Sequence, residues 1–365
     1  MSTLVCIPLE EQAGWSKGAQ PQAGEPVILA IDVSRSKWVY CLRWGGQEQR
    51  QVSTPGELRH LQALVRKYAS SQLHVVYEAC GFGFEIAWWL QEQQIDVMVI
   101  APSKVERAPG RRVKTDRIDA AKMALKREQG QLKGIYVPSR PRHEDRQLGR
   151  TYVQTIKDRR REQTRIRSLL QEHGRLGPPP AAGWAPYRAW LENQQLPAPV
   201  ASSVRVLLAL RESADRNAKE IKREILAIAK HPPYSSIIGA LTEQAGVGPF
   251  SAMLLVLELI TMTRFRSGQA LAHYLGVTPS EYTSGPIVRR GPILKCGPGV
   301  VRALLVQCAW RSIRRDQGDP KLRALYDRLK PKAQSKRAII AVARQLAVSL
   351  YARWTSEETP LVLSH

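Results

Sequence analysis

Short apolar runs and amphipathic stretches alternate along the first third of the chain. An apolar run at residues 27–33 predicts a strand buried on both faces, and residues 37–43 predict its hairpin partner. Further strands are expected at 49–53, 73–78 and 96–100, with helices at 54–70, 85–93 and 116–128. Thr54 and Glu57 have capping-box spacing at the start of the first helix. This order predicts a mixed α/β sheet that ends near Pro138.

The hydrophobic period lengthens after residue 140. Residues 140–173 carry an apolar stripe with helical spacing and predict one long helix, which the Gly-Pro-Pro-Pro run at 177–180 breaks. Residues 181–198 are expected to be irregular, and a second long helix at 199–230 could pair with the first as an antiparallel arm. Later helices are expected at 250–259, 265–275, 298–315 and 334–355, and a loop rich in turn residues at 276–285.

These patterns predict a fold of the class α/β plus all-α. The expected parts are a loose leader at 1–25, an α/β domain at 26–138, a long-helix coiled-coil and linker region at 139–236, a mostly helical domain at 237–356 and a tail at 357–365.

Charge changes this picture. The chain has 365 residues and a formal net charge of +23, which indicates a polyanionic partner, nucleic acid first and an anionic membrane second. Residues 1–100 hold 8 basic and 10 acidic residues, a net of −2, whereas residues 101–180 hold 21 and 9, a net of +12. The basic surface is therefore expected from the middle and the C-terminal part of the chain.

Several classes are disfavoured by what the sequence lacks. The five cysteines show no CxxC spacing and the seven histidines show no HxxxH or HExxH spacing, which argues against a zinc ribbon or a disulfide framework. The N-terminus has no signal-peptide pattern, and no apolar run reaches roughly 18 residues. We expect a cytoplasmic protein with reduced thiols and no membrane span.

Four acidic residues are the first candidates for chemistry. Asp32 and Glu78 each end a predicted strand, and sites gather at strand ends in open α/β sheets. Asp116 and Asp119 stand three residues apart, so a helix presents both on one face. The plain alternative for this pair is a solvated helix start. Together the four carboxylates suit Mg²⁺, which serves phosphodiester chemistry.

Basic residues gather in two places before residue 170. A loop ahead of the acidic pair carries Arg111, Arg112 and Lys114. The first long helix carries a run whose candidates for binding nucleic acid are Arg159, Arg160, Arg161 and Arg165. A charge run is often only a solvated helix face, but the bias here is almost all positive, which favours contact with a nucleic-acid backbone.

Ser284 is the last candidate, in the predicted loop at 276–285. A serine before a glycine is commonly a turn residue. Arg289, Arg290 and Lys295 follow it closely, with Arg302 soon after, and these cations could hold a phosphate. The loop contains no histidine, so any base that activates the hydroxyl must come from elsewhere, or the metal cluster must do so.

At this point the sequence resembles a known family, the DEDD-type transposases of bacterial insertion sequences. The matching segments occur in the family's order over about residues 27–312. They are AIDVS at 30–34, YEA at 77–79, KTDRIDA at 114–120, AGVGP at 245–249, YLGVTP at 274–279, EYTSG at 281–285, RGPILK at 290–295, RALL at 302–305 and AW at 309–310. Each segment is weak alone, and together they are specific.

The resemblance implies an RNase H-like (RuvC-like) N-terminal domain in which Asp32, Glu78, Asp116 and Asp119 bind Mg²⁺. It implies that Ser284 attacks a DNA phosphate and forms a covalent phosphoserine link. It also implies a coiled coil used in assembly, a homo-oligomer from dimer to tetramer on DNA, and a structured guide RNA encoded by the element. A nucleoid-associated protein acting on the element's ends and its target would follow.

One departure from the family and two other functions accompany this interpretation. The family usually has Asn where this chain has Pro298, after Lys295-Cys296-Gly297, and proline suits a helix start but has no amide to offer. The first alternative function is a Mg²⁺-dependent, Holliday-junction-like nuclease that uses water and no covalent serine. The second is a catalytically decayed nucleic-acid-binding protein.

Overall fold

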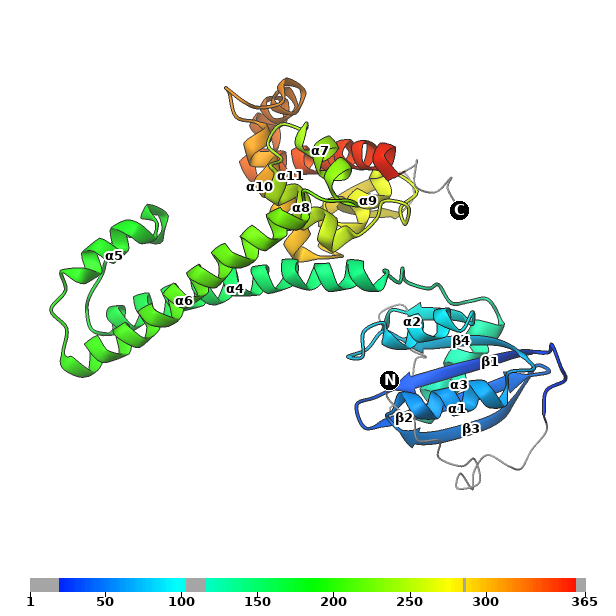
Figure 1. The fold of residues 1–365 in the computed structure, drawn as a ribbon. Coiled ribbons are helices and arrows are strands. Elements are labelled where there is room, and N and C mark those ends of the chain that lie inside the picture. The colour runs from blue at the N-terminus through cyan, green and yellow to red at the C-terminus, as the bar shows by residue number, and fades with distance from the viewer. Residues whose placement is uncertain (1–19, 103–115, 285–286, 359–365) are drawn as a thin grey trace. The chain divides into compact units, whose positions relative to one another are not determined.

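The computed structural model describes residues 20–102, 116–284 and 287–358 (Figure 1). The side chains of residues 116, 117, 282–284, 287–290, 332 and 333 also lie outside this description. The chain divides into two compact units, Met1–Arg140 and Pro141–His365. The predicted five-part division stays a prediction.

The first unit is built on a five-stranded sheet with the order β3-β2-β1-β4-β5. Its strands are β1 (Pro26–Val33), β2 (Lys37–Trp44), β3 (Gln47–Pro55), β4 (Gln72–Glu78) and β5 (Asp96–Ile100). Strand β2 runs antiparallel to β1 and β3, whereas β4 runs parallel to both β1 and β5. The predicted mixed α/β sheet and the order of its strands and helices are confirmed.

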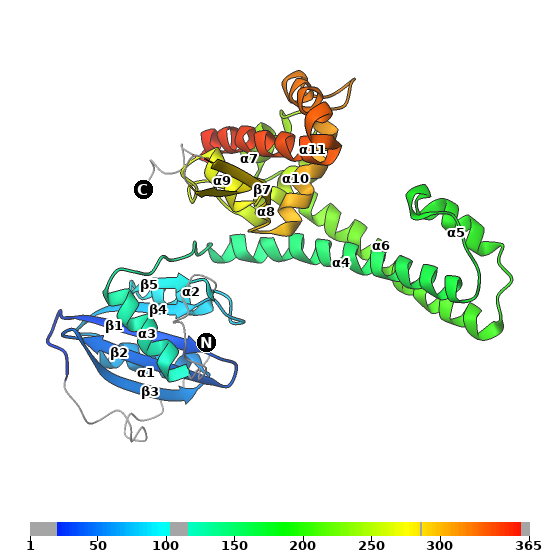
Figure 2. The same cartoon turned by 180° about the vertical axis from the view of Figure 1, so that it is seen from behind.

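Helices cover both faces of this sheet (Figures 1 and 2). They are α1 (Leu58–Lys67), α2 (Glu85–Glu92) and α3 (Asp116–Glu128). Because successive side chains of a strand point to opposite faces, Leu29 and Ile31 of β1 pack with α1 and α2, whereas Ile28 and Ala30 pack with α3. Two apolar cores, one on each side, explain why β1 is a continuous apolar run.

The predicted start of the first helix is wrong. Thr54 pairs with Trp38 in the sheet and is nearly buried, so β3 continues to Pro55. Helix α1 begins only at Leu58, and its N-cap residue Glu57 is extended and makes no side-chain capping bond. Pairing with β2 satisfies the backbone of this segment, and the capping-box spacing is a coincidence of composition.

The second unit opens with an arm of helices. They are α4 (Arg140–Glu172, whose first residue closes the first unit), a 3₁₀ turn (Pro180–Ala182), α5 (Trp184–Glu192) and α6 (Ala198–Ile228). Ile166 of α4 packs in one cluster with Val204 of α6, and Arg159 pairs with Asp215 at 2.7 Å. Moving back along α4 therefore moves forward along α6, which confirms the predicted antiparallel pairing. Helix α5 lies in a stretch that was predicted to be irregular.

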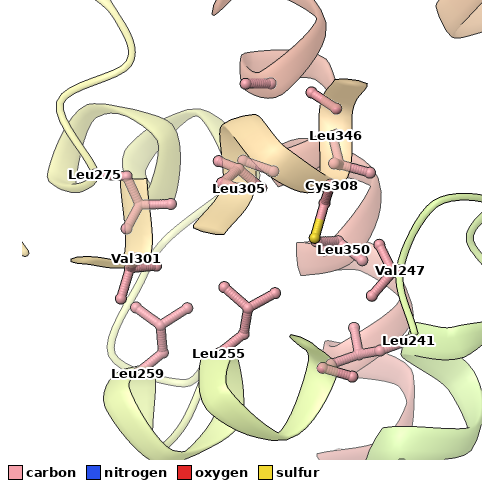
Figure 3. Close-up of a cluster of buried hydrophobic side chains, with 14 of the residues drawn as sticks. Leu241, Val247, Leu255, Leu259, Leu275, Val301, Leu305, Cys308, Leu346 and Leu350 are labelled. Carbon is pink, nitrogen blue, oxygen red and sulfur yellow. The ribbon is translucent and has the colours of Figure 1, made fainter. Parts of the chain in front are cut away.

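The rest of this unit is a helical globule with one large apolar core (Figure 3). Its helices are α7 (Ser235–Thr242), α8 (Pro249–Leu259), α9 (Gly268–Tyr274), α10 (Gly299–Ser312) and α11 (Pro320–Glu358). Leu255, Leu305 and Leu346 meet at the centre of this core. Helix α11 changes direction at Gln334, where φ is 60° and ψ is 157°, so the helix predicted at 334–355 is only its second half.

The predicted loop at 276–285 is mostly a strand. Strands β6 (Pro279–Ser284) and β7 (Ile287–Ile293) form an antiparallel hairpin, with Tyr282 opposite Arg289 and Ser284 opposite Ile287. Ser, Thr and Pro dominate this segment and imitate a turn, whereas cross-strand pairing decides the structure. Among the helices of the described residues, none is long and apolar enough to cross a membrane.

Candidate active site

Sheet register brings two of the four predicted acids together. The last recorded pair between parallel β1 and β4 is Ile31 with Tyr77. The next residue on each strand is Asp32 on β1 and Glu78 on β4. Neighbouring strands lie roughly 4.8 Å apart, and residues that match in parallel register point to the same face. Asp32 and Glu78 are therefore side by side at the carboxyl ends of two adjacent strands.

These two acids lie on the face of the sheet that α3 covers. Two residues before each of them, Ala30 and Val76 belong to the apolar core that Ala120 and Met123 of α3 complete. Since a strand repeats every two residues, Asp32 and Glu78 share that face with them. The helix that begins at Asp116 is thus packed on the same side of the sheet as the strand-end acids.

Ion pairs show which end of α3 lies beside the acids. Near the last turn of the helix, Arg127 contacts Asp96, the first residue of β5. Glu128, its last residue, pairs at 2.8 Å with Arg43. The C-terminal end of α3 therefore lies where the parallel strands begin. Its N-terminal end points to where they finish, which is where Asp32 and Glu78 stand.

Simple lengths place Asp119 at the level of Asp32. From Glu128 back to Asp119 are nine helical steps, or about 13 Å. Arg43 is opposite Ile28, and from Ile28 to Asp32 are four strand steps, again about 13 Å. Asp116 lies one further turn along α3, and its side chain is outside the described part.

The electrostatic surroundings agree with this placement. Burial raises the pKa of the Cys80 thiol, a backbone hydrogen bond at Phe82 opposes this, and the negative charge of Asp32 raises it further, which agrees with an Asp32 carboxylate near the turn that follows β4. Carboxylate oxygens suit a hard divalent cation. Among the described side chains, which do not include that of Asp116, no three His, Cys, Asp or Glu residues form a group that could hold a metal ion.

The predicted serine and its basic neighbours lie on the hairpin of the second unit. Ser284 is the last residue of β6, while Arg289 and Arg290 lie on β7. The side chains of all three are outside the described part, as are residues Arg111, Arg112 and Lys114 altogether. Lys295 follows the hairpin with a positive φ of 54° and an exposed side chain.

Arg302 has a structural partner that the sequence did not indicate. Its Nη1 donates to the carbonyl oxygens of Leu275 and Cys296, both at 2.9 Å. These two carbonyls lie on the chain segments that enter and leave the hairpin. The arginine predicted to hold a phosphate therefore also clamps the base of the hairpin that carries Ser284.

Two glycines make this clamp possible, and sequence reasoning missed both. Gly276 and Gly297 have φ values of +66° and +69°. A Cβ on Gly297 would stand 1.9 Å from the Tyr274 carbonyl oxygen, and one on Gly276 would stand 2.6 Å from the backbone of Cys296. The signal available in the sequence was a glycine shortly before and another shortly after residues 279–293. Pro298 is the N-cap of α10, with φ −72° and ψ 110°, so the substituted proline fits the helix start.

Several arginines predicted to bind nucleic acid are used inside the arm. Arg159 pairs with Asp215 of α6, and burial of both side chains is substantial. Arg161 and Arg165 pair at 2.9 Å with Asp158 and Glu162, each within α4. Arg160 is exposed, and no carboxylate among the described residues pairs with it.

Comparison with known proteins supplies the family. The model described as "Transposase IS116/IS110/IS902 family" matches residues 239–327, and a DEDD transposase model of IS110, described as "Transposase", matches residues 29–174. The chain belongs to the DEDD-type insertion-sequence transposases. The two models divide the candidate residues of this transposase. The family model that matches residues 29–174 covers all four acids, and the one that matches residues 239–327 covers the hairpin with Ser284.

Relatives over most of the chain carry the same name. The transposase is 28% identical over 290 residues to a putative transposase, y4qE, of Sinorhizobium fredii, covering 78% of this chain and 71% of the relative. It is 26% identical to y4rJ of the same organism, over 89% and 91% of the two chains. A probable family 20 transposase of Pseudomonas aeruginosa is 27% identical over 66% and 71%. As a transposase, the protein has DNA as its substrate.

Proposed function

We propose that this transposase cuts and rejoins DNA through a phosphoserine intermediate formed on Ser284, with Mg²⁺ held by Asp32, Glu78, Asp116 and Asp119. The observation that carries the proposal is the parallel register of Asp32 and Glu78 beneath the N-terminal end of α3. The first unit is then an RNase H-like domain. The sheet order β3-β2-β1-β4-β5 supports this, because β1 and β4 end together at its centre.

The acids suit the metal in kind, and the register supports their common location. Hard carboxylate oxygens are the donors that Mg²⁺ takes, and three of the four acids belong to one end and one face of the sheet by register and helix length. When bound, the metal supplies charge stabilisation at the oxygens of the reacting phosphate. The protein's own part is to hold these carboxylates on rigid strand and helix ends, so that little reorganisation is needed during the reaction.

Ser284 supplies the second part of the proposed site. Its place at the end of β6, on a hairpin whose base Arg302 ties, holds the residue on a defined element and not on a free loop. Arg289, Arg290 and Lys295 would bind the phosphate that the hydroxyl attacks. The acids and the serine belong to separate compact units, which is compatible with one protomer's acids meeting another's serine in a dimer or tetramer.

An element-encoded guide RNA is part of the proposal. The second unit has 36 basic and 18 acidic residues, a net charge of +18, which supports a large polyanionic partner and is compatible with RNA bound beside DNA. Sequence choice would then lie in base pairing and not in side chains, as in other RNA-guided systems. Nucleoid association in the bacterial cytoplasm follows from the same charge.

A covalent adduct tests the serine mechanism. Wild-type protein, guide RNA, Mg²⁺ and DNA of the element's ends are incubated, and denatured samples are examined for protein-linked DNA. We expect an adduct in the wild type and none with Ser284→Ala. Ser280→Ala is the matched control, because Ser280 lies on the same hairpin and its Oγ donates to Pro292 O at 3.0 Å.

Free cleaved ends without an adduct, equally abundant in Ser284→Ala, would overturn the serine mechanism in favour of a metal-dependent nuclease. Binding without any strand breakage, in the wild type and the variants alike, would indicate the decayed protein.

A further inference from the structure

A cavity of about 280 Å³ lies within the second unit, between α4, α8 and the first turns of α10. None of its lining residues lies on the hairpin strands or in the first unit. Its lining residues are Arg146, Gly149, Arg150, Val153, Gln154 and Lys157 of α4, Leu254, Leu257 and Glu258 of α8, and Pro298, Gly299, Val300, Val301 and Leu304 at α10. None of them belongs to the proposed catalytic residues.

The walls of the cavity are apolar. Leu254 and Leu257 form one side, and Val300 and Leu304 form the other. Gly149 brings α4 close to α8, since a Cβ there would stand only 3.2 Å from Leu257 Cδ1. Val300 is 39% exposed, although most valines of such a core are buried. An apolar surface left open in this way indicates a binding site for an apolar group.

The rim of the cavity is basic. Arg146 and Arg150 both pair with Glu258, and the shorter distance, 2.8 Å, joins Arg146 Nη2 to Glu258 Oε1. One carboxylate therefore neutralises only one of the two guanidinium charges. Lys157 is exposed one turn beyond Val153, and no carboxylate of the described residues pairs with it. Three cations and one anion leave a net charge of +2 around an apolar cavity. This arrangement complements a ligand whose apolar part is attached to an anionic group.

The volume of the cavity limits which ligands it can hold. An apolar cavity of about 150 Å³ already holds a benzene ring. Pockets for drug-sized ligands begin near 300 Å³. A cavity of about 280 Å³ therefore fits one nucleobase with part of its sugar, and it is too small for a dinucleotide cofactor.

We propose that this cavity binds one unstacked base of a single nucleic-acid strand, with the flanking phosphates at Arg150 and Lys157. The aliphatic walls bury the apolar face of the base, and the basic rim binds the backbone phosphates. The inference rests on the family's use of DNA but not on Ser284 or the four acids. It gives the long arm a second use, because α4 supplies both the rim and the pairing with α6.

The test compares base-bearing and abasic strands. Affinities of the full-length protein are measured in chelator, at fixed salt, for a thymidine strand of about ten nucleotides and for an abasic strand of equal length. The same pair is repeated with uridine and abasic ribose. We expect the base-bearing strand to bind at least about fivefold more tightly in the wild type, because the base buries apolar surface in the cavity.

Val300→Trp fills the cavity without removing a charge. We expect it to bring the ratio of the two affinities close to one while affinity for the abasic strand is unchanged. Val206→Trp on α6 is the control, because Val206 is 60% exposed and lies away from the cavity, and it should keep the wild-type ratio. The sugar type that shows the larger loss identifies the strand as DNA or RNA.

Lys157→Gln is the second variant and leaves the core untouched. We expect weaker binding of both strands and a salt slope lowered by about one. Arg216→Gln, an exposed cation of α6, should leave the base preference as it is. A ratio near one in the wild type, or an unchanged ratio in a folded Val300→Trp, would overturn the proposal. Either result would leave the adduct test unaffected, since no step here needs Mg²⁺ or Ser284.

Discussion

The two units of the transposase position their charged residues by different means. In the first unit, with 19 basic and 14 acidic residues, the acids of interest stand at strand and helix ends, where backbone register fixes them. In the second unit, with 36 and 18, the arginines lie along helix surfaces, where each side chain can turn to a partner. The backbone register fixes the position of a charged side chain at a strand end. A long charged side chain on a helix surface can instead turn toward different partners.

This difference shows which sequence signals can be trusted. Asp32 and Glu78 were singled out because each ended a strand, and the register placed them side by side. The arginine run of α4 was singled out by composition, and Arg159, Arg161 and Arg165 turned out to have carboxylate partners within the arm. Position along an element therefore carried more information than local abundance of charge.

The largest expected effect tests the register of the first unit. Asp32→Asn should lower strand exchange by about 100-fold or more, since it removes an oxygen charge worth several kcal/mol at a metal-assisted site. DNA binding by the second unit should stay close to wild type. The measurement is the rate of strand exchange on the element's ends, together with the affinity for the same DNA.

Asp96→Asn is the matched control for that variant. Asp96 lies at the opposite end of the sheet, where His74 Nδ1 at 2.8 Å and Arg127 contact it. We expect near-normal strand exchange and a stability loss of about 1 kcal/mol at most, because half of its side chain is exposed. Equal loss of activity in both variants would mean that the two ends of the sheet do not differ as we infer.

An intermediate effect tests the carboxylate that holds α4 to α8. Glu258 is 18% exposed and binds Arg146, which is 15% exposed. Burial alone would raise the pKa of Glu258, but the hydrogen bonds and charges of Arg146 and Arg150 outweigh it and hold this pKa below its usual range. Glu258→Gln should therefore lower the free energy of unfolding by about 2 kcal/mol at pH 7.

The pH dependence of this loss has a defined sign. A carboxyl with a lowered pKa in the folded state stabilises the protein above its unfolded pKa, about 4.3, and this contribution disappears as the pH falls through the folded value. The difference between wild type and Glu258→Gln should thus shrink below pH 4. Denaturant unfolding at several pH values measures it, with the exposed Glu220→Gln as control. A difference that grows in acid would contradict the assignment.

The smallest expected effect separates two neighbouring arginines of α4. Arg159→Gln breaks the pair with Asp215 and should cost about 1 kcal/mol of stability. Arg160→Gln should leave stability unchanged and lower the salt slope of nucleic-acid binding by about one. Unfolding curves and salt titrations of both variants decide this, and identical behaviour would mean that the internal pairing does not distinguish them.

Most of the first unit could be predicted from the sequence, because buried parallel strands are continuous apolar runs with clear limits. The start of α1 could not, since Thr54 satisfies both a capping pattern and a strand partner, and only the presence of Trp38 opposite decides between them. The order of the acids was predictable. The direction of α3 across the sheet was not, because it depends on the contacts of its C-terminal end with Asp96 and Arg43.

The second unit was less predictable near its candidate serine. The hairpin at Pro279–Ile293 is held by pairing between β7 and a mostly polar β6, and a polar strand has no hydrophobic signature. The double use of Arg302 was hidden as well, since its acceptors are backbone carbonyls, which no sequence pattern displays. The cavity beside Val300 depends on packing among three helices and could not be foreseen from any one of them.

The clamp below the hairpin also makes the hairpin adjustable. Arg302, Gly276 and Gly297 fix its base in the helical globule, and β6 and β7 pair with each other beyond that base. Adding or removing two residues on each strand would move the end of the hairpin by roughly 7 Å and keep the same side chains on the same face. The hairpin that carries Ser284 can therefore be lengthened or shortened in steps while the helical globule stays unchanged. A series of such variants would measure how far from the globule Ser284 has to lie.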